Sequence, residues 1–125
     1  IDVIVSDHKP EDEESKRLPF AQAATGAIGV ETLLPLSLEL FHNESLKLNK
    51  IIEMLTINPS KILKINKGSL KKGMDADICV FDINKPWVVK ANNLKSKSKN
   101  TAIEDRKLQG KVLMTFLNGE LVFNQ

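Results

Sequence analysis

An acid and an imidazole stand side by side at the end of the first apolar stretch of this 125-residue sequence. Residues 1–6 read Ile-Asp-Val-Ile-Val-Ser, Asp7 and His8 follow directly, and a charged loop with four more acids begins at Lys9. A β-strand that is buried on both faces and ends in Asp-His more often directs these groups into a site, where both could transfer protons. A strand-end cap or turn acid is the alternative for Asp7.

The elements that would position this pair are a strand, a long loop and a helix. Residues 1–6 are expected to form the strand and residues 8–29 an irregular loop that ends in glycine-rich sequence. Apolar residues then recur at helical spacing, which predicts an amphipathic helix over 30–42 with Pro35 near its first turn. The pair would therefore lie where the strand meets the loop.

Two shorter helices are expected next. The second helix should cover about residues 49–56, and a third should start with Asn58 as its N-cap and Pro59 at its first helical position. His42 falls near the end of the first helix and is expected to face outward.

The period of the sequence changes to two after Gly68, which indicates β-structure. Residues 91–107 are polar and rich in Lys and Ser, which predicts a solvated loop. Asn118-Gly119 is a strong hairpin signal. The expected strands cover 76–82, 87–89, 111–117 and 120–123. We expect one sheet, because an isolated hairpin is not stable in water without a further partner.

Charge also divides the chain into two units. Residues 1–59 carry 10 acids and 5 bases, whereas residues 60–125 carry 6 acids and 13 bases. We therefore expect one unit over 1–65 and a β unit over 66–125. Nucleic-acid binding by the basic half is not expected, because the chain has no Tyr and one Trp to interleave with its lysines.

The composition is typical of a soluble globular protein, with 42% hydrophobic and 27% charged residues. No stretch approaches the roughly 20 apolar residues of a membrane helix, so no membrane span is expected. The single cysteine, Cys79, lies in an apolar run and is expected to be a packed thiol in a reducing compartment, with the cytoplasm as default. The chain begins directly on a strand, so we expect a fragment or a processed portion.

Three stretches together resemble dihydroorotases, within the cyclic amidohydrolase superfamily. The first is VSDHKPEDEESKRLPFAQAATGAIGVETLLPL, the second NPSKILKINKGSLKKGMDADICVFD and the third GKVLMTFLNGELVF. The resemblance implies an α/β fold, namely the C-terminal fragment of a (β/α)8 TIM-barrel metal-dependent hydrolase plus part of its small β-sandwich. Barrel enzymes place their chemistry at the C-terminal ends of the strands.

The resemblance assigns Asp7 to the aspartate that ends the eighth barrel strand, as metal ligand and catalytic proton carrier. A carboxylate beside zinc can take a proton from water and deliver it to the leaving amide nitrogen, and an amide side chain could do neither. His8 matches the histidine of the family's Asp-His pair, with substrate contact, a supporting role or simple packing left open. Ala24 and Gly26 match a small-residue loop that offers backbone groups to the substrate, although a plain loop-to-helix junction needs the same flexibility.

One position departs from the family. Dihydroorotases commonly read Asp-His-Ala-Pro-His here, and the last histidine helps to hold the substrate carboxylate, but this chain has Glu11 in its place. A glutamate cannot donate to an anion at neutral pH. Either Lys9 or Arg17 takes over anion recognition, or substrate binding is altered or lost. The alternative for these cations is a solvated loop that balances its acids.

The other metal ligands of the family lie on strands one, four, five and six, and none of those strands is expected in these residues. A zinc site needs about four protein groups, and this chain alone can supply one. Two classes of function follow. The parent is a zinc dihydroorotase, or it is a non-catalytic subunit that scaffolds aspartate transcarbamoylase. Within the enzyme class, allantoinase and dihydropyrimidinase are further alternatives. We also expect a homo-oligomer.

Overall fold

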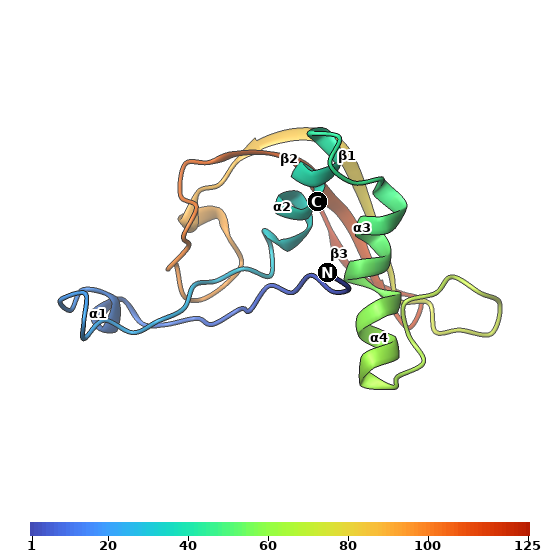
Figure 1. The fold of residues 1–125 in the computed structure, drawn as a ribbon, viewed down its shortest axis with the longest axis horizontal. Coiled ribbons are helices and arrows are strands. Elements are labelled where there is room, and N and C mark those ends of the chain that lie inside the picture. The colour runs from blue at the N-terminus through green and yellow to red at the C-terminus, as the bar shows by residue number, and fades with distance from the viewer.

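The computed structural model describes residues 1–125, and Figure 1 shows most of the helices beside a small sheet and one short helix at the far end of an extended loop. The helices are α1 (Glu13–Lys16), α2 (Leu33–His42), α3 (Leu48–Leu55), α4 (Ile57–Leu63) and the 3-10 helix η1 (Ala91–Asn93). The strands are β1 (Ile78–Val88), β2 (Lys107–Leu117) and β3 (Glu120–Asn124). None of the helices is long and apolar enough to cross a membrane.

The three strands form one antiparallel sheet in the order β1-β2-β3, which confirms the expected pairing. The β2–β3 turn is made by Asn118 and Gly119, both with positive φ, of 51° and 84°. Positive φ at both central residues is the requirement of a type I′ hairpin turn. The Asn-Gly signal therefore located this turn correctly.

The prediction of two separate strands at 76–82 and 87–89 was wrong, because β1 runs through both. The strand continues past an irregularity in its pairing with β2, between Asp82 and Pro86. Asp82 Oδ1 accepts hydrogen bonds from the Asn84 and Lys85 amides there, at 2.8 and 3.2 Å. A bulge of this kind lets a strand accommodate proline, which cannot donate to the ladder.

The positions of α2, α3 and α4 were predicted to within a few residues, but the cap of α4 was not. The prediction that 8–29 is wholly irregular was wrong, because α1 forms there with Asp12 as its N-cap. The first helix begins at Leu33 rather than 30, which places Pro35 in its first turn as expected. The N-cap of α4 is Thr56 rather than Asn58, and the Asn58 side chain instead donates to the Asp2 carbonyl at 2.8 Å. His42 does not face outward: it is partly buried, and its Nε2 lies 3.0 Å from the Ile83 carbonyl oxygen of β1.

The core joins the sheet to the loops above it. Its buried members are Ile28, Val89, Leu94 and Leu108. Helix α2 packs on β2, where Leu38 is fully buried, and α3 packs on both α2 and α4. Because Leu94 belongs to this core, the prediction that 91–107 is simply a solvated loop was wrong.

Residues 1–6 do not form a β-strand in this structure. The only hydrogen bond that they make between backbone groups runs from the Ile4 amide to the Met54 carbonyl, at 3.1 Å. The first bridge of β type comes later, between His8 and Ala27. A strand is defined by its ladder, and none of the three strands of the sheet pairs with this segment.

Cys79 also differs from its prediction. The residue lies on β1 and is exposed rather than packed. Partial burial nevertheless raises the pKa of its thiol, so the thiolate is disfavoured at neutral pH.

Candidate active site

Asp7 and His8 lie where the extended N-terminal segment turns into the loop. Asp7 has a φ of 44°, a left-handed conformation that Asp tolerates better than most residues. Its exposed carboxylate makes no hydrogen bond or ion pair with the rest of the chain. The carboxylate is therefore unpaired in this structure.

The start and the end of the loop lie side by side. We call residues 8–12 its outgoing arm and residues 24–29 its return arm, and His8 helps to join them. The Lys9 amide donates to the Ala27 carbonyl at 2.9 Å, and the Gly29 amide donates to His8 Nδ1 at 3.1 Å. A neutral imidazole that accepts at Nδ1 carries its proton on Nε2. The Nε2–H group of His8 then remains free as a donor.

Ala24 and Gly26 lie on the return arm, where the backbone of Gly26 adopts a positive φ close to the Lys9 side chain. Gly26 has a φ of 126°, and a Cβ at this position would lie 2.7 Å from the Lys9 side chain. Only glycine fits both constraints. The Ala24 and Gly26 carbonyls accept from Lys16 Nζ at 2.7 and 3.1 Å, whereas the Gly26 amide has no partner. The backbone group that this arm offers is therefore an N–H donor.

The two candidate anion-binding cations lie in different places. Lys9 Nζ is near Gly26, 3.2 Å from Glu11 Oε1 and 3.3 Å from Thr25 Oγ1. Arg17 pairs with Glu13 at α1, at the far end of the extended loop (Figure 1). The structure thus brings Lys9 to the candidate site and leaves Arg17 away from it.

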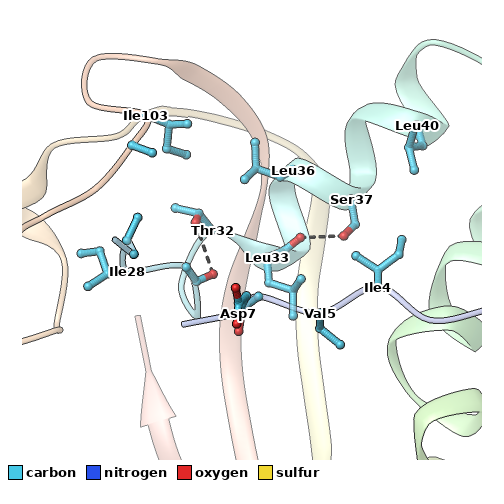
Figure 2. A pocket seen from close by; sticks show the side chains of 15 residues that line it. Ile4, Val5, Asp7, Ile28, Thr32, Leu33, Leu36, Ser37, Leu40 and Ile103 are labelled. Atoms are coloured by element: carbon cyan, nitrogen blue, oxygen red, sulfur yellow. Dashed lines mark hydrogen bonds between the residues drawn. The ribbon is translucent and has the colours of Figure 1, made fainter. Parts of the chain in front are cut away.

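A cavity of about 650 Å³ lies beside Asp7. Its mostly apolar walls come from the N-terminal segment, the Gly26–Gly29 turn, α2, Ala102 and Ile103 (Figure 2). Two hydroxyls in the wall are occupied, because Thr32 Oγ1 donates to the Gly29 carbonyl and Ser37 Oγ to the Leu33 carbonyl. The Ser6 hydroxyl also lines the cavity and makes no hydrogen bond. Asp7 is accordingly the uncommitted charged side chain at this cavity.

The chain does not form a metal site alone. No group of three or more His, Cys, Asp or Glu side chains is placed to hold an ion. His8 turns Nδ1 toward the backbone of Gly29, which leaves Asp7 as the carboxylate ligand that this part could contribute. One ligand is too few for a zinc site.

Sequence reasoning missed the residues that hold the loop from outside. Asn100 reaches Glu11 and Gly26, and Glu31 accepts hydrogen bonds from the amides of Lys95 and Ser96. The partners are 64 to 89 residues apart in sequence, so no local spacing could have revealed them.

The sequence of this chain is similar to those of known proteins. The sequence profile described as "Amidohydrolase family" matches residues 2–122. The chain belongs to the amidohydrolase family. Members of this family are metal-dependent.

Two curated relatives named dihydroorotase confirm the resemblance found in the sequence. That of Wolbachia sp. subsp. Drosophila simulans (strain wRi) is 42% identical over 125 residues, covering 100% of this chain and 28% of the relative. That of Acetivibrio thermocellus is 42% identical over 126 residues, covering 100% of this chain and 30% of the relative. The chain thus spans less than a third of the length of these relatives.

Solved structures of other proteins are similar to this chain in fold. Dihydropyrimidinase from Brevibacillus agri NCHU1002 superposes with a TM-score of 0.93 at 21% identity, covering 99% of this chain and 28% of that one. L-Hydantoinase from Arthrobacter aurescens gives a TM-score of 0.77 at 30% identity, covering 83% of this chain and 24% of that one. The dihydropyrimidinase likeness, below 25% identity, concerns the fold alone.

Proposed function

We propose that this chain is the C-terminal part of a zinc-dependent dihydroorotase. The parent would hydrolyse the cyclic amide of dihydroorotate reversibly to N-carbamoyl-aspartate, in de novo pyrimidine biosynthesis. The observation that carries this proposal is the 42% identity to dihydroorotases over the entire chain, which includes the Asp7-His8 loop. Hydantoinase and dihydropyrimidinase structures reach only 20% to 30%.

In the parent, residues 1–6 are the last strand of a (β/α)8 barrel, and 66–125 belong to a small β-sandwich. The uncovered edges of residues 1–6 support this proposal, since the segment makes one backbone hydrogen bond here and has room for neighbouring strands. Asp7 would then stand at the C-terminal end of a barrel strand, where this fold places its chemistry.

Asp7 is the proposed proton carrier. Its carboxylate would take a proton from the attacking water and pass it to the amide nitrogen that leaves the opened ring. Asp7 is also proposed as one ligand of Zn²⁺, with the remaining ligands supplied by residues outside these 125. The lack of any partner for Asp7 within this chain supports both assignments.

Three groups around Asp7 are proposed to bind substrate. The His8 Nε2–H and the free Gly26 amide are donors suited to the oxygens of a cyclic amide, and Ala24 lies on the same arm as Gly26. Lys9 is the cation placed to meet the substrate carboxylate. It would leave Glu11 to do so, and the Lys9 side chain is exposed to solvent.

A second function has one observation in its favour. Glu11 stands where dihydroorotases commonly have an anion-binding histidine, and its charge occupies Lys9. A parent that has lost substrate binding could act as a non-catalytic subunit that scaffolds aspartate transcarbamoylase. A homo-oligomer and a cytoplasmic location are proposed for either function.

The deciding experiment uses the full-length protein loaded with zinc. We expect hydrolysis of dihydroorotate and condensation of N-carbamoyl-aspartate, at rates far above those for hydantoin, dihydrouracil and allantoin. A preference for one of the other rings would assign the parent to that branch of the cyclic amidohydrolases. No turnover of any ring at full metal content would instead favour the scaffold.

A further inference from the structure

The segment from Leu94 to Ile103 crosses the outside of the candidate active-site loop. It is closed at its base, where the Val89 amide donates to the Arg106 carbonyl at 3.0 Å and the Asp105 amide donates to the Val89 carbonyl at 2.9 Å. Leu94 is 6% exposed within the core, and Ile103 packs against the same core. The segment is therefore anchored on both sides of its polar middle.

Asn100, in that polar middle, contacts both arms of the loop. Its Oδ1 accepts from the Glu11 amide on the outgoing arm at 3.4 Å, and its Nδ2 donates to the Gly26 carbonyl on the return arm at 3.3 Å. Its own carbonyl accepts from the Ile28 amide at 3.2 Å. One residue thus spans the two arms just beyond the His8–Ala27 bridge.

The chemistry of these contacts requires an amide side chain. The Glu11 N–H can only donate, so it must face oxygen, and the Gly26 carbonyl can only accept, so it must face nitrogen. Ser98 adds to the outgoing side, with its hydroxyl 2.5 Å from the Glu11 carbonyl and also close to Asn100 Oδ1. An alanine side chain would serve neither arm, and an aspartate side chain would serve only the outgoing one. The carbonyl of residue 100 would still accept from Ile28, and the Gly26 carbonyl would keep Lys16 as a donor.

We infer that Asn100 is a positioning residue, which sets the separation of the two loop arms and thereby the place of the substrate-binding groups on them. The inference rests on the proposed function for the meaning of those groups. Gly26 carries the free amide, and the outgoing arm carries Lys9 and Glu11, so a change in separation would weaken binding. Asp7 precedes the arms, so its proton transfer should change less.

The test compares Asn100→Ala with Asn93→Ala in the full-length protein. Asn93 lies in the same connection and is exposed, and its side chain makes no hydrogen bond. Losing hydrogen bonds to both arms should raise KM for dihydroorotate about tenfold in Asn100→Ala, with kcat changed less than about threefold. Asn93→Ala should match the parent in both parameters.

Hydrogen–deuterium exchange gives a second readout that needs no activity. The Glu11, Lys9 and Gly29 amides should exchange about tenfold faster in Asn100→Ala, because the Glu11 amide loses its partner and the other two donate across the arms whose separation changes. Asn100→Asp keeps the acceptor but not the donor, so the Glu11 amide should stay near the parent rate while the Gly29 amide still exchanges faster. This variant also decides the matter if Asn100→Ala fails to fold.

A purely structural role would give a different pattern. Loss of folded protein lowers kcat and the thermal midpoint at constant KM, and this pattern would overturn the inference, as would unchanged exchange at both arms. If the parent turns over no cyclic amide, the proposed function fails by itself. The exchange pattern then still decides whether Asn100 holds the arms together.

Discussion

The C-terminal sheet and the N-terminal segment satisfy their backbone groups in opposite ways. Strands β1 and β2 pair along most of their length, and β3 closes the sheet through a tight turn. Residues 1–6 make one backbone hydrogen bond, and Ile1 and Val5 are 100% and 70% exposed. Backbone groups and apolar side chains are rarely left this open in a finished fold. The contrast teaches that the sheet satisfies backbone groups through its own ladders, whereas the segment leading to Asp7 leaves most of its backbone groups unpaired within this chain.

The largest effect is expected from changing the end of the N-terminal segment. Asp7→Asn in the full-length protein should lower turnover of dihydroorotate by about 10²–10⁴-fold, because an amide cannot carry the proton. The fold should be retained, since Asp7 makes no contact that the substitution removes. Steady-state rates in both directions, measured with metal content and thermal midpoint, test this expectation.

Glu11→Gln is the matched control for that change. It removes a carboxylate four residues away whose partner is the exposed Lys9, so the rate should change little. Retention of more than about a tenth of the parent rate by Asp7→Asn would exclude the proton-carrier role.

Zinc binding should differ between the 125-residue chain and the full-length protein. The 125-residue chain by itself should keep no stoichiometric zinc after dialysis and should not hydrolyse dihydroorotate, because it has one suitable ligand where about four are needed. The full-length protein should retain zinc under the same conditions. Metal analysis of both decides, and one zinc per isolated chain would contradict the expectation.

Changes in the packing of the sheet should lower the stability of the protein. Gly110 has a φ of 102°, and a Cβ there would lie 2.4 Å from Leu38 Cδ1, which is fully buried. Gly110→Ala should lower the free energy of unfolding by about 2–4 kcal/mol, from overpacking and backbone strain together. Denaturant unfolding of the full-length protein measures it.

Gly119→Ala separates these two causes. Gly119 also has a positive φ, of 84°, but its Cβ would meet only the Ala76 side chain at 3.9 Å. The cost should be the backbone strain alone, about 1–2 kcal/mol. Equal costs at the two glycines would show that α2 yields to the added methyl group without loss of packing.

The smallest effect on stability is expected from the exposed Asp77, whose side chain accepts a hydrogen bond from the β2–β3 hairpin. Asp77 accepts from Lys67 Nζ at 2.6 Å and from the Asn118 amide at 2.9 Å, and these bonds lower the pKa of its carboxyl below the ordinary 3.8. A lowered pKa means that the contribution is present above pH 3.8 and is lost as the pH falls through the lower folded value.

Asp77→Asn should therefore lower the thermal midpoint slightly at pH 7, and the difference from the parent should shrink in acid. Asp75→Asn is the control, because Asp75 pairs with Lys67 but holds no backbone amide. A pH-independent difference for Asp77→Asn would exclude the carboxylate as its cause.

The sequence alone determined the elements whose signals are local. The Asn118-Gly119 turn follows from the positive φ that these two residue types tolerate, and α2 follows from apolar spacing with a proline allowed near its start. The Asp7-His8 pair was likewise found by its position after an apolar stretch.

Only the tertiary structure decided the contacts that join distant segments. It turned His42 onto β1, made Leu94 part of the core and set Asn100 between the arms of a loop more than seventy residues earlier. A polar side chain can satisfy its hydrogen bonds with water or with any backbone group that folding brings near, and the local sequence does not distinguish these partners. The residue types of the candidate site were therefore proposed from the sequence, whereas the groups that contact them depend on how the chain folds back on itself.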